Sequence, residues 1–186
     1  MTKGRLIAIV GPSGVGKDSL MRALAAAEPH LRVAKRTITR PLDPDSEDFF
    51  SATEAEFRDQ EAAGAFALSW GAHELRYGIA TTDLDRVQTG TEVLANLSRT
   101  VLEEAQCVFG RLAVLSVSAA PEILAARLAD RGRERPEEIL KRLSRAEVRL
   151  PNSLAVTHLD NSGPLDQTVA AARAALYPSR EALEIR

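Results

Sequence analysis

The beginning of the chain restricts the fold more than any other part of the sequence. Residues 5–10 are mostly apolar and rich in side chains branched at Cβ, which predicts a short, buried strand of a parallel sheet. Residues 18–27 place Leu20, Met21 and Leu24 on one face of a predicted helix. Between these two elements lie Gly11, Pro12, Ser13, Gly14, Val15, Gly16 and Lys17. A glycine-rich turn that joins a buried strand to a helix predicts an α/β fold.

This seven-residue turn matches the phosphate-binding pattern Gly-x4-Gly-Lys in the strand–turn–helix context that the pattern requires. Glycines permit backbone angles that point several N–H groups inward, where they bind phosphate oxygens. The N-terminus of the following helix adds a partial positive charge. Lys17 supplies a full charge to the β- and γ-phosphates of a nucleoside triphosphate. We therefore predict that residues 11–17, together with Asp18 and Ser19, bind ATP.

The residue after the lysine departs from the usual pattern. That position usually holds serine or threonine, whose hydroxyl binds Mg²⁺, whereas here Asp18 follows Lys17 and Ser19 comes next. A carboxylate oxygen suits Mg²⁺, so Asp18 is a candidate ligand of the metal or of one of its waters. Alternatively, its charge stabilises the start of the helix. We expect ATP and Mg²⁺ as cofactors and keep both interpretations of Asp18.

Short apolar runs alternate with helical patterns along the rest of the chain. The runs lie at 91–95, 112–117 and 154–159. The helical patterns lie at 98–106, 121–130, 136–149 and 165–176. This alternation predicts an α/β fold of the P-loop NTP hydrolase type, in which helices cover both faces of a parallel sheet.

The stretch from about residue 40 to residue 78 interrupts the alternation. It begins with an acidic, turn-rich segment and continues with a predicted helix at 53–63 and aromatic-containing pieces at 66–70 and 75–77. We interpret it as an insertion on the same domain. The predicted single domain over 1–186 has a core at 1–39 and 79–177, an acceptor-binding flap at 40–78, a lid at 131–136 and a loose tail at 178–186.

Composition excludes several classes of protein. A net charge of −2 over 186 residues gives no support to nucleic-acid binding, so an anionic ligand must be held by local basic clusters. The single cysteine, Cys107, cannot form an internal disulfide. The apolar run at 6–10 is too short for a signal-peptide core or a membrane span. We expect a cytoplasmic protein without a membrane partner, and the sequence does not give its oligomeric state.

Beyond the loop, nearly the whole chain resembles the guanylate kinase superfamily. The segments that carry the resemblance are Thr37-Ile38-Thr39-Arg40-Pro41, Glu47-Asp48-Phe49-Phe50, Ser69-Trp70 with His73 and Tyr77-Gly78, Arg127-Leu128 with Arg131-Gly132, and Arg142-Leu143. The resemblance implies a P-loop core, a flap for the phosphate acceptor and a lid that closes over ATP.

Departures from that family are as informative as the matches. Where guanylate kinases read the guanine edge with two acids, this chain has Ser69 and Asn96, and a flap tyrosine is replaced by Phe49. The basic residues that accumulate around these positions are Arg36, Arg40, His73, Arg76 and Arg99. The implied acceptor lacks guanine and carries additional phosphate, which arginine binds with two parallel hydrogen bonds.

One branch of the superfamily, the ribose 1,5-bisphosphate phosphokinases of phosphonate breakdown, is similar to this chain at these positions. The matching segments are 11–18, 39–41, 46–48, 70–73, 76–78, 96–99, 131–134 and 161–163. The resemblance implies transfer of the terminal phosphoryl group of ATP to the 1-phosphate of ribose 1,5-bisphosphate. The product would be 5-phospho-α-D-ribose 1-diphosphate (PRPP). A divergent guanylate or nucleoside monophosphate kinase, and a non-catalytic interaction module, are the alternatives.

The resemblance also implies roles for individual residues. The catalytic residues would be Lys17, Arg131 and Arg142, and Asn161 would contact the adenine side of ATP. The sugar phosphate would be bound by Arg36, Arg40, His73, Tyr77, Asn96 and Arg99. Each role has a structural alternative: arginines in surface ion pairs or at element ends, a packed histidine, and a turn at 161–163. No general base is expected, because a phosphate acceptor is already an anion near neutral pH.

Overall fold

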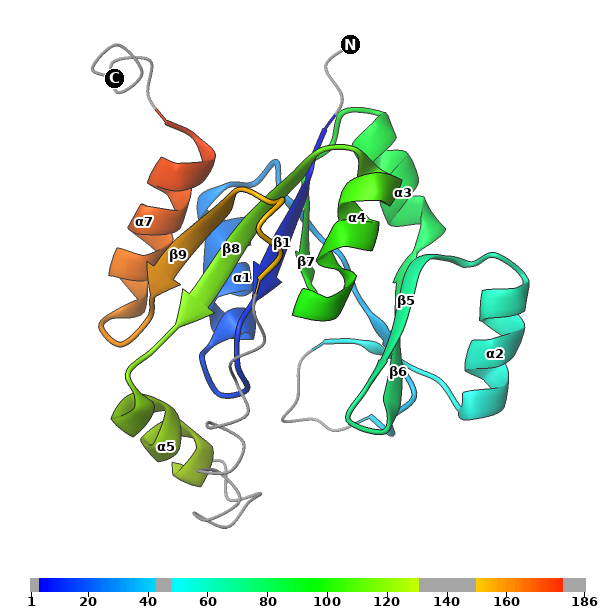
Figure 1. Cartoon of the computed structure of the whole chain (residues 1–186), viewed down its shortest axis with the longest axis horizontal. Coiled ribbons are helices and arrows are strands. Elements are labelled where there is room, and N and C mark those ends of the chain that lie inside the picture. The colour runs from blue at the N-terminus through cyan, green and yellow to red at the C-terminus, as the bar shows by residue number, and fades with distance from the viewer. Residues whose placement is uncertain (1–3, 43–47, 131–149, 179–186) are drawn as a thin grey trace.

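A five-stranded sheet, in which every pairing is parallel, forms the centre of the computed structural model (Figure 1), which describes residues 4–42, 48–130 and 150–178. In spatial order its strands are β2 (Arg32–Val33), β7 (Val93–Asn96), β1 (Leu6–Val10), β8 (Leu112–Ser118) and β9 (Val156–Asp160). The helices that accompany it are α1 (Lys17–Ala27), α3 (Thr81–Gln88), the 3₁₀ turn η1 (Arg99–Val101), α4 (Leu102–Phe109), α5 (Pro121–Asp130) and α7 (Leu165–Leu176).

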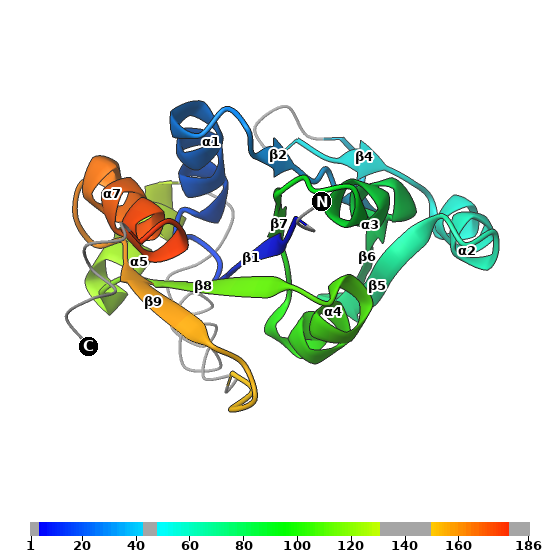
Figure 2. The same ribbon diagram turned by 90° about the horizontal axis from the view of Figure 1, so that it is seen from above.

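Strand β1 packs against helices on both faces of this sheet. Because successive strand side chains point to opposite faces, Leu6, Ala8 and Val10 enter the apolar cluster that α3 and α4 complete. Ile7 and Ile9 enter the second cluster, which α1 and α7 complete. Figure 2 shows these two pairs of helices on opposite sides of the strands. All five residues of β1 are 0% exposed, so the predicted parallel sheet with helices on both faces is confirmed.

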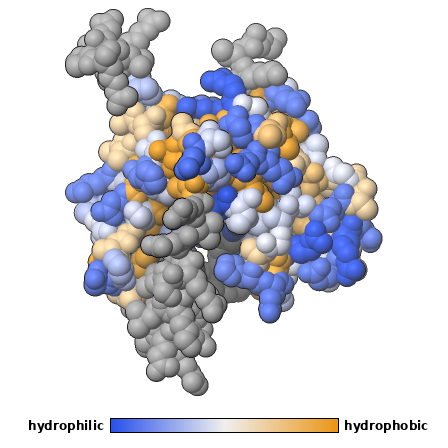
Figure 3. Space-filling model, in the orientation of Figure 1, coloured by the Kyte–Doolittle hydropathy of each residue, from blue (hydrophilic) through white to orange (hydrophobic). Residues whose placement is uncertain are grey.

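A smaller four-stranded sheet lies beside the first. In spatial order its strands are β4 (Phe50–Ser51), β3 (Thr37–Ile38), β6 (Leu75–Ala80) and β5 (Phe66–Ala72), and α2 (Glu54–Ala62) accompanies them. Helix α2 starts at a capping box, in which Thr53 and Glu56 satisfy each other's backbone N–H groups. The outer end of the molecule, where α2 lies, is covered by hydrophilic side chains (Figure 3).

Most of the elements expected from periodicity are present. The strands expected at 5–10, 91–95, 112–117 and 154–159, and the helices expected at 18–27, 53–63, 98–106, 121–130 and 165–176, correspond to elements of the structure. The helix expected at 136–149 lies outside the described residues. Strands β2, β3 and β4 and helix α3 were not predicted, and the aromatic-containing pieces at 66–70 and 75–77 belong to strands β5 and β6. Among the described residues, no helix is both long and apolar enough to cross a membrane.

A cluster of hydrogen-bonded polar side chains connects the end of α7 to the amino-terminal edge of the main sheet. Glu92, just before β7, accepts hydrogen bonds from Arg5, from the hydroxyl of Tyr177 and, at 3.1 Å, from the ring Nε2 of His30. Arg5 also donates to the carbonyl of Leu176 at 2.8 Å. The cluster therefore joins the residue before β1, the segment after α1 and the end of α7.

Candidate active site

The phosphate loop connects β1 to α1 at the carboxyl edge of the main sheet. Gly14 and Gly16 have φ angles of 80° and 92°, which favour glycine. A Cβ on Gly16 would lie 2.7 Å from the Nδ2 of Asn161, so this position also lacks room for a side chain. Gly16 is the N-cap of α1, and no side chain caps the helix there. The first N–H groups of α1 are thus left for a ligand, and the glycine cradle fits the predicted phosphates.

Lys17 folds back over the loop that precedes it. Its Nζ donates to the carbonyl oxygens of Gly11 at 2.9 Å and of Pro12 at 3.0 Å. The ammonium group is therefore held beside the loop by its stem and by two carbonyl groups. The role of this ammonium in binding phosphate oxygens stays a prediction.

Asp18 and Asn96 meet next to the loop. Asn96 ends β7, which pairs with β1, and it is 7% exposed. Its Nδ2 lies 3.3 Å from the Oδ1 of Asp18, in the first turn of α1. The residue predicted to bind the acceptor thus contacts the candidate metal ligand. The oxygens of Asp18 and Asn96 are of the type that Mg²⁺ prefers, so the donor set fits the metal.

Several predicted acceptor residues come together on the second sheet. The guanidinium carbon of Arg36 lies 5.1 Å from the ring centre of Tyr77, whose ring stacks on that of Trp70. The guanidinium carbon of Arg40 lies 4.6 Å from the ring centre of Phe49. The Nε atoms of Arg36 and Arg40, and that of Arg99 after β7, are buried, and burial lowers the pKa of Arg99. Arginine nevertheless remains protonated, so each of these side chains carries a positive charge.

Other basic residues of the second sheet are directed elsewhere. Arg76 forms two hydrogen bonds with Glu61 of α2, at 2.8 and 2.9 Å. The hydroxyl of Ser69 donates to the same carboxylate at 2.6 Å. His73 is exposed at the tip of the β5–β6 hairpin, where it and Glu74 have φ angles of 52° and 61°. Glu61 was not predicted, because nothing in the sequence of α2 distinguishes it from its acidic neighbours.

Asn161 is buried against the phosphate loop. Its Nδ2 donates to the carbonyl of Val15 at 2.7 Å, and its Oδ1 accepts from the hydroxyl of Thr168 at 2.8 Å. Its role as an adenine contact stays a prediction. Arg131 and Arg142, the predicted lid arginines, lie outside the described residues.

Two further residues, one beside the loop and one behind Asn161, were not predicted as site residues. Arg127 on α5 donates to the carbonyl of Asn161 at 2.9 Å and approaches the carbonyl of Val15 at 3.4 Å. Thr168 on α7 donates to the Oδ1 of Asn161. The available signal for Thr168 was its polar side chain on the otherwise apolar face of the predicted helix at 165–176.

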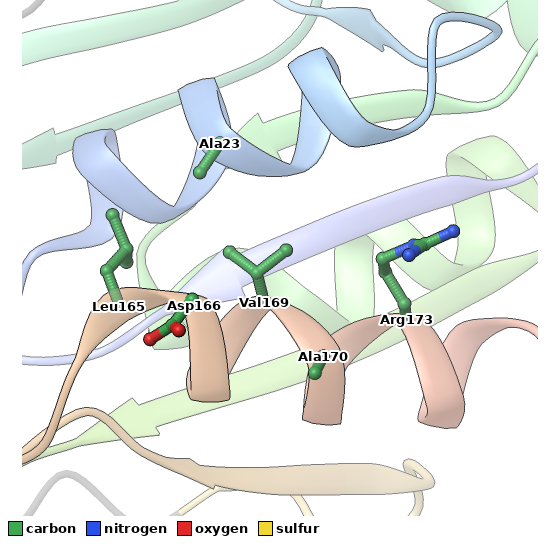
Figure 4. Close-up of a pocket in the computed structure, with 6 residues that line it drawn as sticks. All are labelled: Ala23, Leu165, Asp166, Val169, Ala170 and Arg173. Carbon is green, nitrogen blue, oxygen red and sulfur yellow. The ribbon is translucent and has the colours of Figure 1, made fainter.

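A hollow of about 350 Å³ between α1 and α7 contains none of these residues. Figure 4 shows the six side chains that line it: Ala23, Leu165, Asp166, Val169, Ala170 and Arg173. Its lining is mainly apolar, and it is not the candidate site.

Comparison with solved structures gives the fold. A guanylate kinase from Anaplasma phagocytophilum superimposes with a TM-score of 0.71 and 15% identity, covering 100% of this chain and 96% of that one. A gluconokinase from Sinorhizobium meliloti 1021 gives a TM-score of 0.57 and 21% identity, covering 99% of this chain and 98% of that one. At these identities the likeness concerns the fold alone.

Comparison with curated proteins gives the family, although no protein-family model matches the chain. Ribose 1,5-bisphosphate phosphokinase PhnN of Ruegeria sp. (strain TM1040) is 51% identical over 180 residues, covering 96% of this chain and 94% of the relative. The protein of the same name from Agrobacterium fabrum is 42% identical over 164 residues, covering 87% of this chain and 90% of the relative. The chain therefore belongs to the ribose 1,5-bisphosphate phosphokinase family.

Proposed function

We propose that this protein transfers the terminal phosphoryl group of ATP to the 1-phosphate of ribose 1,5-bisphosphate, which yields PRPP and ADP in phosphonate breakdown. The observation that carries the proposal is the pairing of a glycine phosphate loop with a second sheet on which arginines gather. Ser69 and Asn96, where guanylate kinases have base-reading acids, contact Glu61 and Asp18 instead. The names of the relatives agree with this acceptor.

The phosphate loop would bind ATP through residues 11–17 and the start of α1. The inward N–H groups and Lys17 neutralise charge on the β- and γ-phosphates, and this stabilisation is the main catalytic contribution of such a site. Asp18 would ligate Mg²⁺ or one of its waters, and Asn96 would hold the Asp18 carboxylate in place. Bound Mg²⁺ supplies further charge neutralisation between the phosphates.

The second sheet would act as the acceptor flap. Arg36, Arg40 and Arg99 would bind the sugar phosphates, and the hydroxyl of Tyr77, beside Arg36, would add a hydrogen bond. His73 would reach the sugar phosphate from the hairpin tip. The nucleophile is a phosphate oxygen that is already ionised, so the protein needs to align it rather than deprotonate it.

The predicted lid would complete the site. We propose that Arg131 and Arg142 approach the transferring phosphoryl group when ATP is bound. Asn161 would contribute on the adenine side only if its amide left the bonds described above.

The test is ADP formation with purified protein, ATP and Mg²⁺, measured side by side with ribose 1,5-bisphosphate and with GMP. We expect turnover with the sugar bisphosphate, formation of PRPP detected by ³¹P NMR, and little turnover with GMP. Lys17→Ala should abolish transfer with either acceptor. Efficient turnover of GMP alone would establish the nucleoside monophosphate kinase. Failure to bind ATP in calorimetry would contradict the proposed function and return the non-catalytic module to consideration.

A further inference from the structure

One peptide of the phosphate loop is held by a buried network. The Nδ2 of Asn161 donates to the carbonyl of Val15 at 2.7 Å, and the Nη1 of Arg127 approaches the same oxygen at 3.4 Å. The hydroxyl of Thr168 donates to the Oδ1 of Asn161 at 2.8 Å. Asn161 and Thr168 are each 3% exposed. The network on the carbonyl of Val15 thus draws on three segments: Arg127 from α5, Asn161 from the connection between β9 and α7, and Thr168 from α7.

The direction of this carbonyl determines the direction of the next N–H group. In a planar trans peptide, the C=O of Val15 and the N–H of Gly16 point to opposite sides. Asn161 holds the C=O on its own side, so the N–H of Gly16 points away from Asn161. Gly16, with φ of 92° and ψ of 25°, has no side chain that would resist rotation of the peptide. The network therefore supplies a constraint that Gly16 itself cannot.

Thr168 anchors the end of the Asn161 amide that faces away from the loop. The two ends of an asparagine amide differ, since the nitrogen donates and the oxygen accepts. A reversed amide would set its oxygen against the carbonyl of Val15 and its nitrogen against the hydroxyl of Thr168. The carbonyl of Val15 disfavours this reversal because it can only accept, and the hydroxyl of Thr168 holds the Oδ1 in place by donating to it. The hydroxyl also lies 3.2 Å from the carbonyl of Asp160. Thr168 acts on the loop without touching it.

We propose that Thr168 is a positioning residue for the phosphate loop. Acting through Asn161, it fixes the Val15–Gly16 peptide so that the N–H of Gly16 is directed at the polyphosphate of the nucleotide. The inference rests on the proposed binding of ATP, and it concerns the polyphosphate rather than the base. It gives Asn161 a role different from an adenine contact, because both ends of its amide are used inside the protein.

The experiment compares two ligands by titration calorimetry: Mg²⁺-ATP and Mg²⁺-bound inorganic triphosphate, which has no base. Thr168→Val has nearly the same shape and lacks the hydroxyl. We expect it to weaken both ligands by the same factor, roughly tenfold for the loss of an orienting buried hydrogen bond. The KM for ATP should rise while that for ribose 1,5-bisphosphate stays constant. Thr168→Ser should restore most of the affinity, and Thr157→Val on β9 is the matched control.

Two results would overturn the proposal. If Thr168→Val weakened ATP and left triphosphate binding intact, Asn161 would act on adenine; if neither ligand were weakened, the network would have only a structural role. Thr168→Ala carries the same test if the valine variant does not fold. The Gly16 amide resonance in ¹⁵N spectra should move in either variant. These titrations contain no sugar phosphate, so an incorrect acceptor assignment would leave them unaffected and would appear only in the turnover assay.

Discussion

Replacing Glu92 by glutamine should destabilise the fold and leave ATP binding intact. Burial alone would raise the pKa of Glu92, but the hydrogen bond from Tyr177, the charge and hydrogen bond of Arg5 and the bond from His30 outweigh burial. The pKa of Glu92 therefore lies below its ordinary value of 4.5. The carboxylate is thus bound more favourably in the folded than in the unfolded chain.

The size of the effect follows from the contacts. Glutamine keeps the shape and one acceptor oxygen, but it loses the charge that faces Arg5. Hydrogen bonds to a charged group contribute about 1.5–3 kcal/mol each. Because the side chain of Glu92 is still 19% exposed, we take the lower end of this range for the whole substitution, about 1.5–2 kcal/mol. For a chain of this length, Tm should fall by roughly 3–8 °C.

The pH dependence tests the cause. A depressed folded-state pKa contributes stability that is present above the unfolded pKa and lost as the pH falls through the folded pKa. The difference in unfolding free energy between wild type and Glu92→Gln should be complete at neutral pH and shrink below about pH 4.5. Urea unfolding followed by circular dichroism measures it, with Glu104→Gln on the exposed side of α4 as control. A difference that did not change with pH, or no difference at neutral pH, would refute the reasoning.

Three further substitutions test other parts of the structure. Gly78→Ala should cost about 1–3 kcal/mol of unfolding free energy, because the new Cβ would lie 2.6 Å from the ring of Phe66; unchanged urea stability would contradict this. Burial raises the pKa of Asp83 despite its bond to Arg86, so Asp83→Asn should be at least as stable as wild type at neutral pH. The stability advantage of the variant should shrink as the pH falls through the pKa of Asp83. A variant less stable than wild type at neutral pH would contradict this reasoning. Asp18→Ala should raise the Mg²⁺ concentration needed for ATP binding in calorimetry, and an unchanged Mg²⁺ dependence would discard the metal-ligand role.

The sequence predicted the elements whose signals are local. Strand β1, the loop and α1 follow one another within residues 6–27, and each has its own pattern of apolar or glycine residues. Helix α3 was missed because only Leu84 and Val87 are apolar among its eight residues, too few for a recognisable stripe. Strands β2, β3 and β4 have two residues each and exist only through pairing with other strands, which no short pattern reports.

The candidate site divides in the same way. The loop residues could be listed from their spacing, but the side chains that orient them come from distant parts of the chain. Asn161 contacts Val15 across 146 residues of sequence, and Asn96 contacts Asp18 across 78. A single sequence contains no information on such pairs. The direction of Arg76 toward Glu61 likewise depends on how α2 packs on the hairpin.

The packing of strand β1 determines how firmly the phosphate loop is held. Its side chains pack alternately into the two apolar clusters on opposite faces of the sheet. A shift of the strand by one residue would move each side chain from one cluster to the other. Strand β1, from which the phosphate loop starts, is therefore held by packing on both faces of the sheet, and it fixes the position of the loop. In the proposed transfer, β1 would keep the phosphate loop in place while the acceptor binds.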